Sequence, residues 1–136
     1  MQQTYQQTLA SPVEYSGIGL HSGKNVNMRM LPAETDTGIV FVRTDLPGHP
    51  EIPANPANVS STVKATTLSA DGAEVFTVEH LMAALSMMGI DNCRIEMDSP
   101  EPPVADGSAG IFADLILQSG RKEQEALRKV YVLDRA

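Results

Sequence analysis

The chain has 136 residues, of which 42% are hydrophobic and only 4% aromatic, a composition typical of one globular domain with an aliphatic core. Its net charge of −7, without any run of Lys or Arg, argues against a nucleic-acid or membrane-surface partner. The single cysteine, Cys93, excludes an internal disulfide and a Cys-rich zinc motif. The sequence shows no signal peptide and no apolar run long enough to span a bilayer, so we expect no transmembrane segment and a cytoplasmic location.

The first three-quarters of the chain has the patterns of strands and turns. Residues 26–31 alternate apolar and polar side chains, and residues 39–43 are β-branched and aromatic. The prolines between Pro47 and Pro56 predict a long irregular loop, and Asp71-Gly72 predicts a hairpin turn. In chain order, the strands are expected at 3–9, 13–19, 26–31, 39–43, 62–69, 74–76, 92–97 and 129–133.

Two later segments have the helical period instead. The first helix is predicted to start with Thr77 as its N-cap and to stop at Gly89. The second is predicted between a Ser108 cap and Gly120. Late helices after many strands indicate an α+β fold: a two-layer domain with a mostly antiparallel sheet and two helices packed on one face.

The first predicted helix has a second face without charge. At about 100° per residue, the stripe that contains Leu81 leaves His80, Ala83, Ala84 and Met87 on the other side. A surface helix would carry Lys or Glu there, so we expect this face to be covered. The chain offers only one sheet, and the second cover is therefore expected to be another domain.

The dipeptide Glu79-His80 is the first candidate for chemistry. Taken alone, it is explained by a solvated helix N-terminus, where the helix dipole favours Glu and tolerates His. In the functional interpretation, His80 binds zinc and Glu79 takes a proton from the metal-bound water. A catalytic zinc needs three protein ligands, whereas the chain has three histidines in all and no His-x-x-x-His pair.

The other polar candidates have simple structural explanations. His21 lies in a glycine-rich turn whose spacing matches no phosphate-binding loop. Asp106 either holds a turn or orients a histidine by accepting from its second ring nitrogen. His49 is expected to be a solvated loop residue, and Cys93 a buried small apolar residue.

Five motifs then occur together in one order. They are Gly-Ile-Gly-Leu-His-Ser-Gly at 17–23, Arg-Thr-Asp-Leu at 43–46, Thr-Val-Glu-His-Leu at 77–81, Gly-Ile-Asp-Asn at 89–92 and Asp-Gly-Ser-Ala at 106–109. In order and spacing they resemble the N-terminal domain of the UDP-3-O-acyl-N-acetylglucosamine deacetylases, the zinc hydrolases that commit Gram-negative bacteria to lipid A synthesis. The resemblance covers essentially the whole chain.

The resemblance implies roles for three residues at the metal. His80 matches a zinc (Zn2+) ligand of the family. Glu79 matches the general base that acts on the zinc-bound water as it attacks the acetamide carbonyl. His21 matches the histidine of the glycine turn, which lies near the active site.

The resemblance also implies roles in substrate binding. Thr62 matches a threonine that contacts the glucosamine, and Asp106 matches an acidic residue linked to activity through structure. Lys64 departs from the family pattern, because apolar residues or Cys stand in this stretch in other members. Its contacts with the sugar or the acyl chain are therefore expected to differ.

Family members have two related domains, and the second supplies what this chain lacks. The remaining zinc ligands, a His and an Asp, come from that domain, as does the histidine that stabilises the oxyanion and protonates the leaving amine. We therefore expect residues 1–136 to be the N-terminal half of a deacetylase of UDP-3-O-acyl-N-acetylglucosamine, inactive and weak in zinc binding without its C-terminal domain. The alternative is a free-standing, non-catalytic binding or assembly module of the same fold. A reading frame that continues into a His-x-x-x-Asp pair would favour the first.

Overall fold

The computed structural model describes residues 4–19, 23–61, 66–104 and 110–128. The strands are β1 (Tyr5–Leu9), β2 (Val13–Gly19), β3 (Asn25–Pro32), β4 (Ile39–Arg43), β5 (Glu51–Pro53), β6 (Val59–Ser61), β7 (Thr67–Ala70), β8 (Ala73–Phe76), β9 (Cys93–Met97), β10 (Pro103–Val104) and β11 (Arg121–Leu127). The helices are the 3-10 turn η1 (Pro56–Asn58), α1 (Glu79–Met87) and α2 (Gly110–Ser119).

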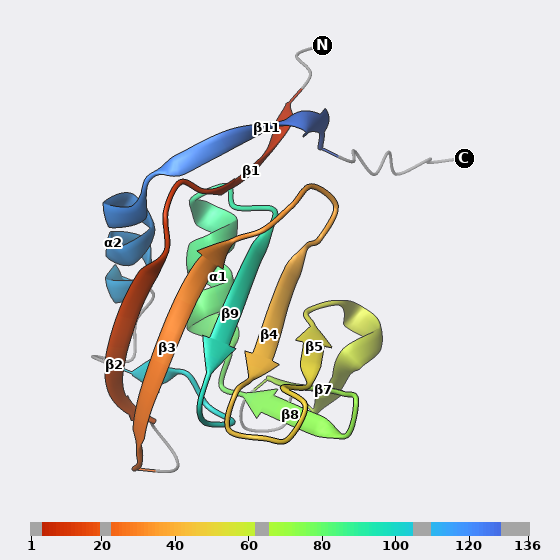
Figure 1. The fold of residues 1–136 in the computed structure, drawn as a ribbon, viewed down its shortest axis with the longest axis vertical. Coiled ribbons are helices and arrows are strands. Elements are labelled where there is room, and N and C mark those ends of the chain that lie inside the picture. Colours follow the sequence, from red (N-terminus) through yellow and green to blue (C-terminus); the bar gives the residue numbers. More distant parts are fainter. Residues whose placement is uncertain (1–3, 20–22, 62–65, 105–109, 129–136) are drawn as a thin grey trace.

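The largest sheet has the strand order β10-β2-β3-β9-β4-β5 (Figure 1). Neighbouring strands are antiparallel except for β4 and β9, which run parallel. In β3 the alternation seen in the sequence buries Val26, Met28 and Met30 on one face of the pleat. The predicted half-buried strand at 26–31 is thus confirmed.

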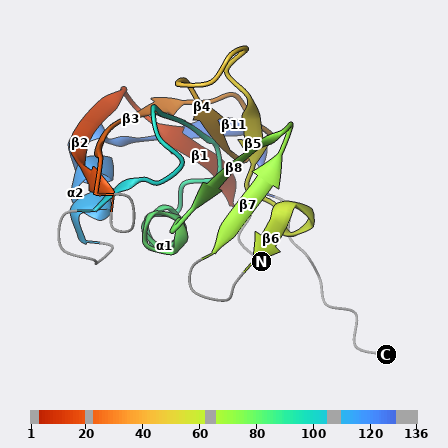
Figure 2. The same ribbon diagram turned by 90° about the horizontal axis from the view of Figure 1, so that it is seen from below.

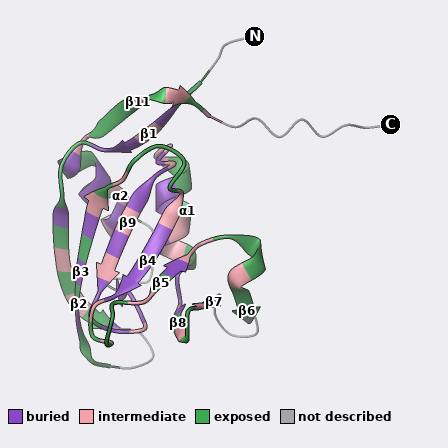
Figure 3. Ribbon diagram, turned by 45° about the vertical axis from the view of Figure 1, so that its right-hand side comes forward, coloured by how far each residue is buried: buried purple, intermediate pink, exposed green. Residues whose placement is uncertain are grey.

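Both α-helices cover one face of this sheet (Figure 2). The core that the helices share with the sheet contains Leu81 and Leu85 of α1 and Phe112 and Ile116 of α2. Figure 3 shows buried residues, in purple, on both helices and on the central strands. The predicted α+β, two-layer class is confirmed. Within the described residues, no helix is long and apolar enough to cross a membrane.

The predicted end of α1 is confirmed as well. Gly89 has a φ of 72°, the left-handed conformation that glycine adopts without strain. The next amide, that of Ile90, donates to the Leu85 carbonyl at 2.9 Å, which closes the last turn.

A two-stranded antiparallel ribbon of β1 and β11 lies beyond the end of the sheet where α1 finishes (Figure 1). The Asp91 amide donates to the Gln7 carbonyl at 2.9 Å and so ties the ribbon to the chain that leaves α1. β11 was not predicted, because its sequence from Arg121 is polar and mostly exposed and carries no strand pattern. The strand expected at 129–133 lies outside the described residues.

The small sheet of β6, β7 and β8 leads directly into α1. Asp71 and Gly72 have φ of 54° and 74°, the two left-handed residues that a tight hairpin turn requires, so the predicted hairpin is confirmed. Of the strand expected at 62–69, the described part begins at Thr67, and residues 62–65 lie outside the described ranges.

The prediction of an irregular loop across the four prolines is wrong in part. β5 pairs with β4 at the sheet edge and buries Ile52 fully, and η1 begins at Pro56. Proline lacks an amide donor, yet an edge strand and the first turn of a helix leave that donor unused. His49 lies in the connection between β4 and β5 and is exposed, as predicted.

A largely buried arginine links the largest sheet to the small sheet of β6, β7 and β8. The Arg43 guanidinium binds both carboxylate oxygens of Asp45, at 2.9 and 2.7 Å, and donates to the Glu74 carbonyl of β8 at 2.8 Å. Its side chain is 8% exposed. These hydrogen bonds, opposed by partial burial, hold the pKa of Asp45 below its ordinary value of 3.8. The Arg-Thr-Asp motif is therefore part of what fixes the hairpin that precedes α1.

Cys93 is fully buried in β9, as predicted, and burial raises the pKa of its thiol to about 12. We expect no reaction with a disulfide reagent at pH 8 in the native protein and one equivalent after denaturation. The native rate should lie at least ~1,000-fold below that of a denatured control, since modification requires unfolding. A fast native reaction would contradict the burial of β9.

Candidate functional site at the start of α1

Glu79 and His80 form the first turn of α1, where the sequence placed them. Val78, directly before them, is 1% exposed and anchors this end of the helix in the core. The Glu79 side chain is exposed, whereas His80 is half-buried. The arrangement presents a carboxylate and an imidazole from one rigid element, which suits a proton acceptor next to a metal ligand.

The backbone of Thr66 holds the Glu79 carboxylate in place. Its amide donates to Glu79 Oε1 at 3.0 Å, and its carbonyl accepts from the Thr77 amide at 3.0 Å. Thr66, the residue directly before β7, therefore fixes both the side chain of Glu79 and the backbone leading into α1. A backbone donor orients a carboxylate without changing its own charge as the pH varies.

The predicted Thr77 cap is wrong. The residue at the N-cap of α1 is Val78, without a side-chain hydrogen bond to the first turn. Thr77 has a φ of 59°, which costs a β-branched residue roughly 1–3 kcal/mol. Its hydroxyl donates instead to Glu101 Oε2 at 2.9 Å. A carboxylate is a stronger acceptor for this hydroxyl than a neutral group, and Thr77 is used as a turn residue rather than a cap.

Glu101 belongs to the segment that joins β9 to β10, the strand at one edge of the largest sheet. It is fully buried, and the preceding carbonyl, that of Pro100, accepts from the Phe76 amide at 2.8 Å. Just beyond it, Pro103 pairs with Gly19 at the end of β2. A Cβ on Gly17 would lie 3.1 Å from the Pro103 Cβ, so the glycine permits this close approach.

The remaining predicted site residues lie outside the described ranges: His21, Thr62, Lys64 and Asp106. The described residues that flank two of these segments are tied to the start of α1. Thr66 follows Thr62 and Lys64 and contacts Glu79, while Gly19 precedes His21 and pairs with the strand that follows Glu101.

Sequence analysis missed Thr66 and Glu101. Thr66 contacts Glu79 through its backbone amide, and a backbone contact leaves no pattern of side chains in the sequence. Glu101 stands among three prolines, and its burial is not expected from the sequence because a glutamate is almost always solvated. The neighbouring prolines, which lack a charged side chain, are the one local feature compatible with a buried position.

The fit of the site to a metal ion is partial. His80 offers one imidazole at a helix start, and Glu79 adds a carboxylate beside it. Among the described residues, no group of three or more His, Cys, Asp or Glu side chains is close enough to hold a metal. A three-ligand zinc site thus requires residues from elsewhere.

The outer face of the helix layer is partly apolar. Met87 of α1 is 71% exposed and Leu117 of α2 is 62% exposed, and Ala83 of α1 is exposed as well. The expectation that Ala84 shares this face is wrong, because it is fully buried. At three residues from Leu81, Ala84 falls within the core stripe of α1.

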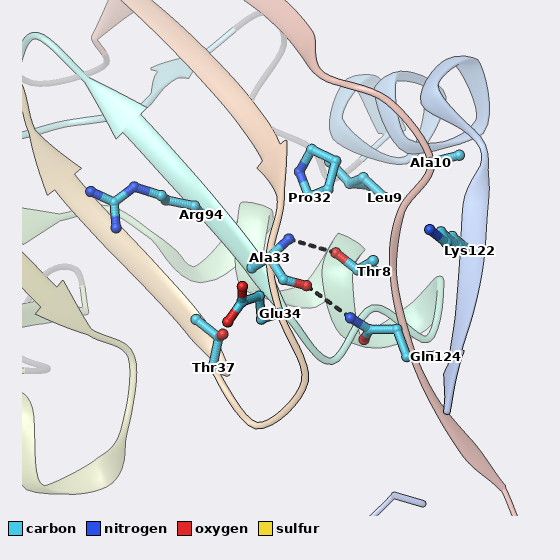
Figure 4. Close-up of a pocket in the computed structure, with 10 residues that line it drawn as sticks. All are labelled: Thr8, Leu9, Ala10, Pro32, Ala33, Glu34, Thr37, Arg94, Lys122 and Gln124. Carbon is cyan, nitrogen blue, oxygen red and sulfur yellow. Dashed lines mark hydrogen bonds between the residues drawn. The ribbon is translucent and has the colours of Figure 1, made fainter. Parts of the chain in front are cut away.

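A cavity of about 660 Å³ lies elsewhere, between the β1–β11 ribbon and the β3–β4 turn (Figure 4). Its polar groups support the fold: Thr8 accepts from the Ala33 amide at 2.9 Å, and Gln124 donates to the Ala33 carbonyl at 2.8 Å. The cavity is next to the ribbon, at the end of α1 opposite Glu79 (Figure 1). It is therefore separate from the candidate site.

Comparison with known proteins agrees with the motifs. Residues 6–136 match the family model described as LpxC, UDP-3-O-acyl N-acetylglycosamine deacetylase. Curated proteins named UDP-3-O-acyl-N-acetylglucosamine deacetylase are similar: that of Myxococcus xanthus is 52% identical over 96% of the chain, that of Syntrophotalea carbinolica 51% over 92%, and that of Hahella chejuensis 48% over 91%. The chain spans only 40–42% of the length of these relatives. It belongs to the UDP-3-O-acyl N-acetylglycosamine deacetylase family.

Proposed function

We propose that this chain is the N-terminal half of a zinc-dependent hydrolase that removes the acetyl group from UDP-3-O-acyl-N-acetylglucosamine. The observation that carries the proposal is the exposed Glu79 carboxylate, held by the Thr66 amide and adjacent to His80 on the first turn of α1. The names of the relatives supply the substrate, and their greater length leaves room for a second domain.

In this proposal Glu79 is the general base. The Thr66 amide orients Oε1, and the second carboxylate oxygen accepts the proton of the attacking water. His80 contributes one ring nitrogen to zinc, and the other ligands come from the second domain. Zinc, when bound, supplies Lewis-acid polarisation and lowers the pKa of water to about 7.

The remaining predicted residues are assigned to the surroundings of the substrate. His21 lies near the reacting groups, Thr62 contacts the glucosamine, and Lys64 binds the substrate beside it. Asp106 supports activity through structure rather than by contact with the reacting groups. The exposed apolar side chains of the helix layer, Met87 and Leu117, are where the second domain packs, since exposed apolar surface commonly marks interaction sites.

The full-length protein that contains this chain tests the proposal. It is expected to release acetate from UDP-3-O-acyl-N-acetylglucosamine and to hold about one zinc ion per chain by elemental analysis. A full-length protein that binds the UDP-sugar without releasing acetate would instead support a non-catalytic binding module.

The 136-residue chain by itself is expected to release no acetate and to lose its zinc on dialysis. The reason is that His80 alone is one ligand, whereas a catalytic zinc takes about three from the protein. Elemental analysis after dialysis, next to the full-length protein treated in the same way, measures the difference. One tightly held zinc in the short chain would contradict the shared site.

A further inference from the structure

The connection between β8 and α1 is unusually short and constrained. β8 ends at Phe76 and α1 begins at Glu79, so the chain changes direction within two residues. Thr77 makes this turn in the left-handed region, with a φ of 59°. Any residue other than glycine or asparagine resists this conformation, and a β-branched one resists it most. Surrounding contacts must therefore hold Thr77 in place.

Three hydrogen bonds between residues that the structure describes hold this turn. The Thr77 hydroxyl donates to the buried Glu101 carboxylate at 2.9 Å, and the Thr77 amide donates to the Thr66 carbonyl at 3.0 Å. The Phe76 amide donates to the Pro100 carbonyl at 2.8 Å, next to Glu101 in the chain. The turn is thus held from two sides: by the segment before β7 and by the segment before β10.

The same contacts lead to the catalytic side chain. Thr66 receives the Thr77 amide on its carbonyl and gives its own amide to Glu79 Oε1. A shift of Thr77 would move the start of α1 and the Thr66 clamp together. The positions of Glu79 and His80 relative to each other and to the substrate would then change. Among the described residues, neither side chain forms a hydrogen bond with Glu101, so this effect would be indirect.

We propose that Glu101 is a positioning residue: through the Thr77 hydroxyl it holds the strained turn that sets the direction of Glu79 and His80. This inference rests on the proposed function of the site. Glu101 takes no part in the reaction itself. A buried carboxylate needs hydrogen-bond donors, and one donor that Glu101 receives is the hydroxyl of Thr77, a β-branched residue whose backbone is in the left-handed region.

The test compares two substitutions of Thr77 in the full-length protein. Thr77→Ser keeps the hydroxyl. Thr77→Gly removes it. Glycine accepts a positive φ, so the fold is retained, but it accepts other φ values as readily, so the turn is no longer held in one conformation once the link to Glu101 is lost. We expect kcat to fall about 100-fold in Thr77→Gly with KM nearly unchanged, and to stay within about threefold of wild type in Thr77→Ser.

Substitutions of Glu101 give the reciprocal measurement. Glu101→Gln retains an oxygen that can accept from Thr77, whereas Glu101→Leu does not. We expect Glu101→Gln to retain part of the wild-type kcat. We expect Glu101→Leu to lose about as much kcat as Thr77→Gly. Equal kcat in Thr77→Gly and Thr77→Ser, with both folded, would overturn the proposal and leave Glu101 a structural residue.

A second readout separates this inference from the proposed function. The exchange rate of the Thr66 amide hydrogen reports the clamp on Glu79 even in a protein that releases no acetate. We expect exchange to be about 10-fold faster in Thr77→Gly than in Thr77→Ser. If the wild type is inactive, the proposed function fails, and this exchange alone decides: equal rates overturn the positioning role, and faster exchange in the glycine variant supports it.

Discussion

Glu79→Gln is expected to lower kcat for acetate release by about 10²–10⁴-fold in the full-length protein, with little change in KM. Glutamine keeps an oxygen that can accept from the Thr66 amide, so the geometry of the turn is retained while the proton acceptor is lost. The loss therefore reports proton transfer rather than folding. Initial rates of acetate release at saturating and limiting substrate measure the two constants.

The matched control is Glu125→Gln, which removes the same charge from an exposed position on β11. It should leave both constants within about twofold of wild type, since surface substitutions of this kind rarely change stability or chemistry. Zinc content should be unchanged in both variants, because His80 is intact. Near-normal kcat in Glu79→Gln would remove Glu79 from the role of base and would require another proton acceptor.

Arg43→Met is expected to destabilise the fold by about 3 kcal/mol, because it breaks the ion pair of a largely buried arginine with the partly exposed Asp45 and removes the donor to the Glu74 carbonyl. Methionine preserves the length and the apolar stem of the side chain. Urea unfolding of the variant and the parent measures the loss. Arg43→Lys keeps the charge but not the planar fork, and should lose about half as much.

The pH dependence identifies the source of this stability. The pKa of Asp45 is lowered in the folded state by the hydrogen bonds from Arg43, so the folded protein holds fewer protons than the unfolded chain near pH 4. The stabilisation is complete above the ordinary value of 3.8 and is lost as the pH falls through the folded value. The stability difference between wild type and Asp45→Asn should accordingly shrink below about pH 4. A difference independent of pH would exclude the ion pair as its cause.

Several elements could be predicted because their signals are local. The alternation of residues 26–31, the Asp71-Gly72 turn and the stop at Gly89 each depend on backbone angles or periodicity within a few residues. Placing Glu79 and His80 on the first turn of a helix followed from the same kind of pattern. These features are set by residue type before any long-range contact forms.

The errors arose where distant contacts override local preference. Thr77 has the residue type of a cap, yet the buried Glu101 carboxylate takes its hydroxyl and the backbone adopts a left-handed turn. β11 has a polar sequence, and only its pairing with β1 makes it a strand. Ala84 is an error of a different kind: its angular position three residues from Leu81 places it in the core stripe of α1, and this spacing is local.

The sequence by itself determined the α+β class, the helix that carries Glu79 and His80, and the motifs shared with the deacetylase family, because residue order and periodicity encode them directly. Only the tertiary structure decided how that helix start is held. The Thr66 backbone and the buried Glu101 reach it from residues 11 or more positions away, and no local pattern records a contact that depends on the folding of the whole sheet.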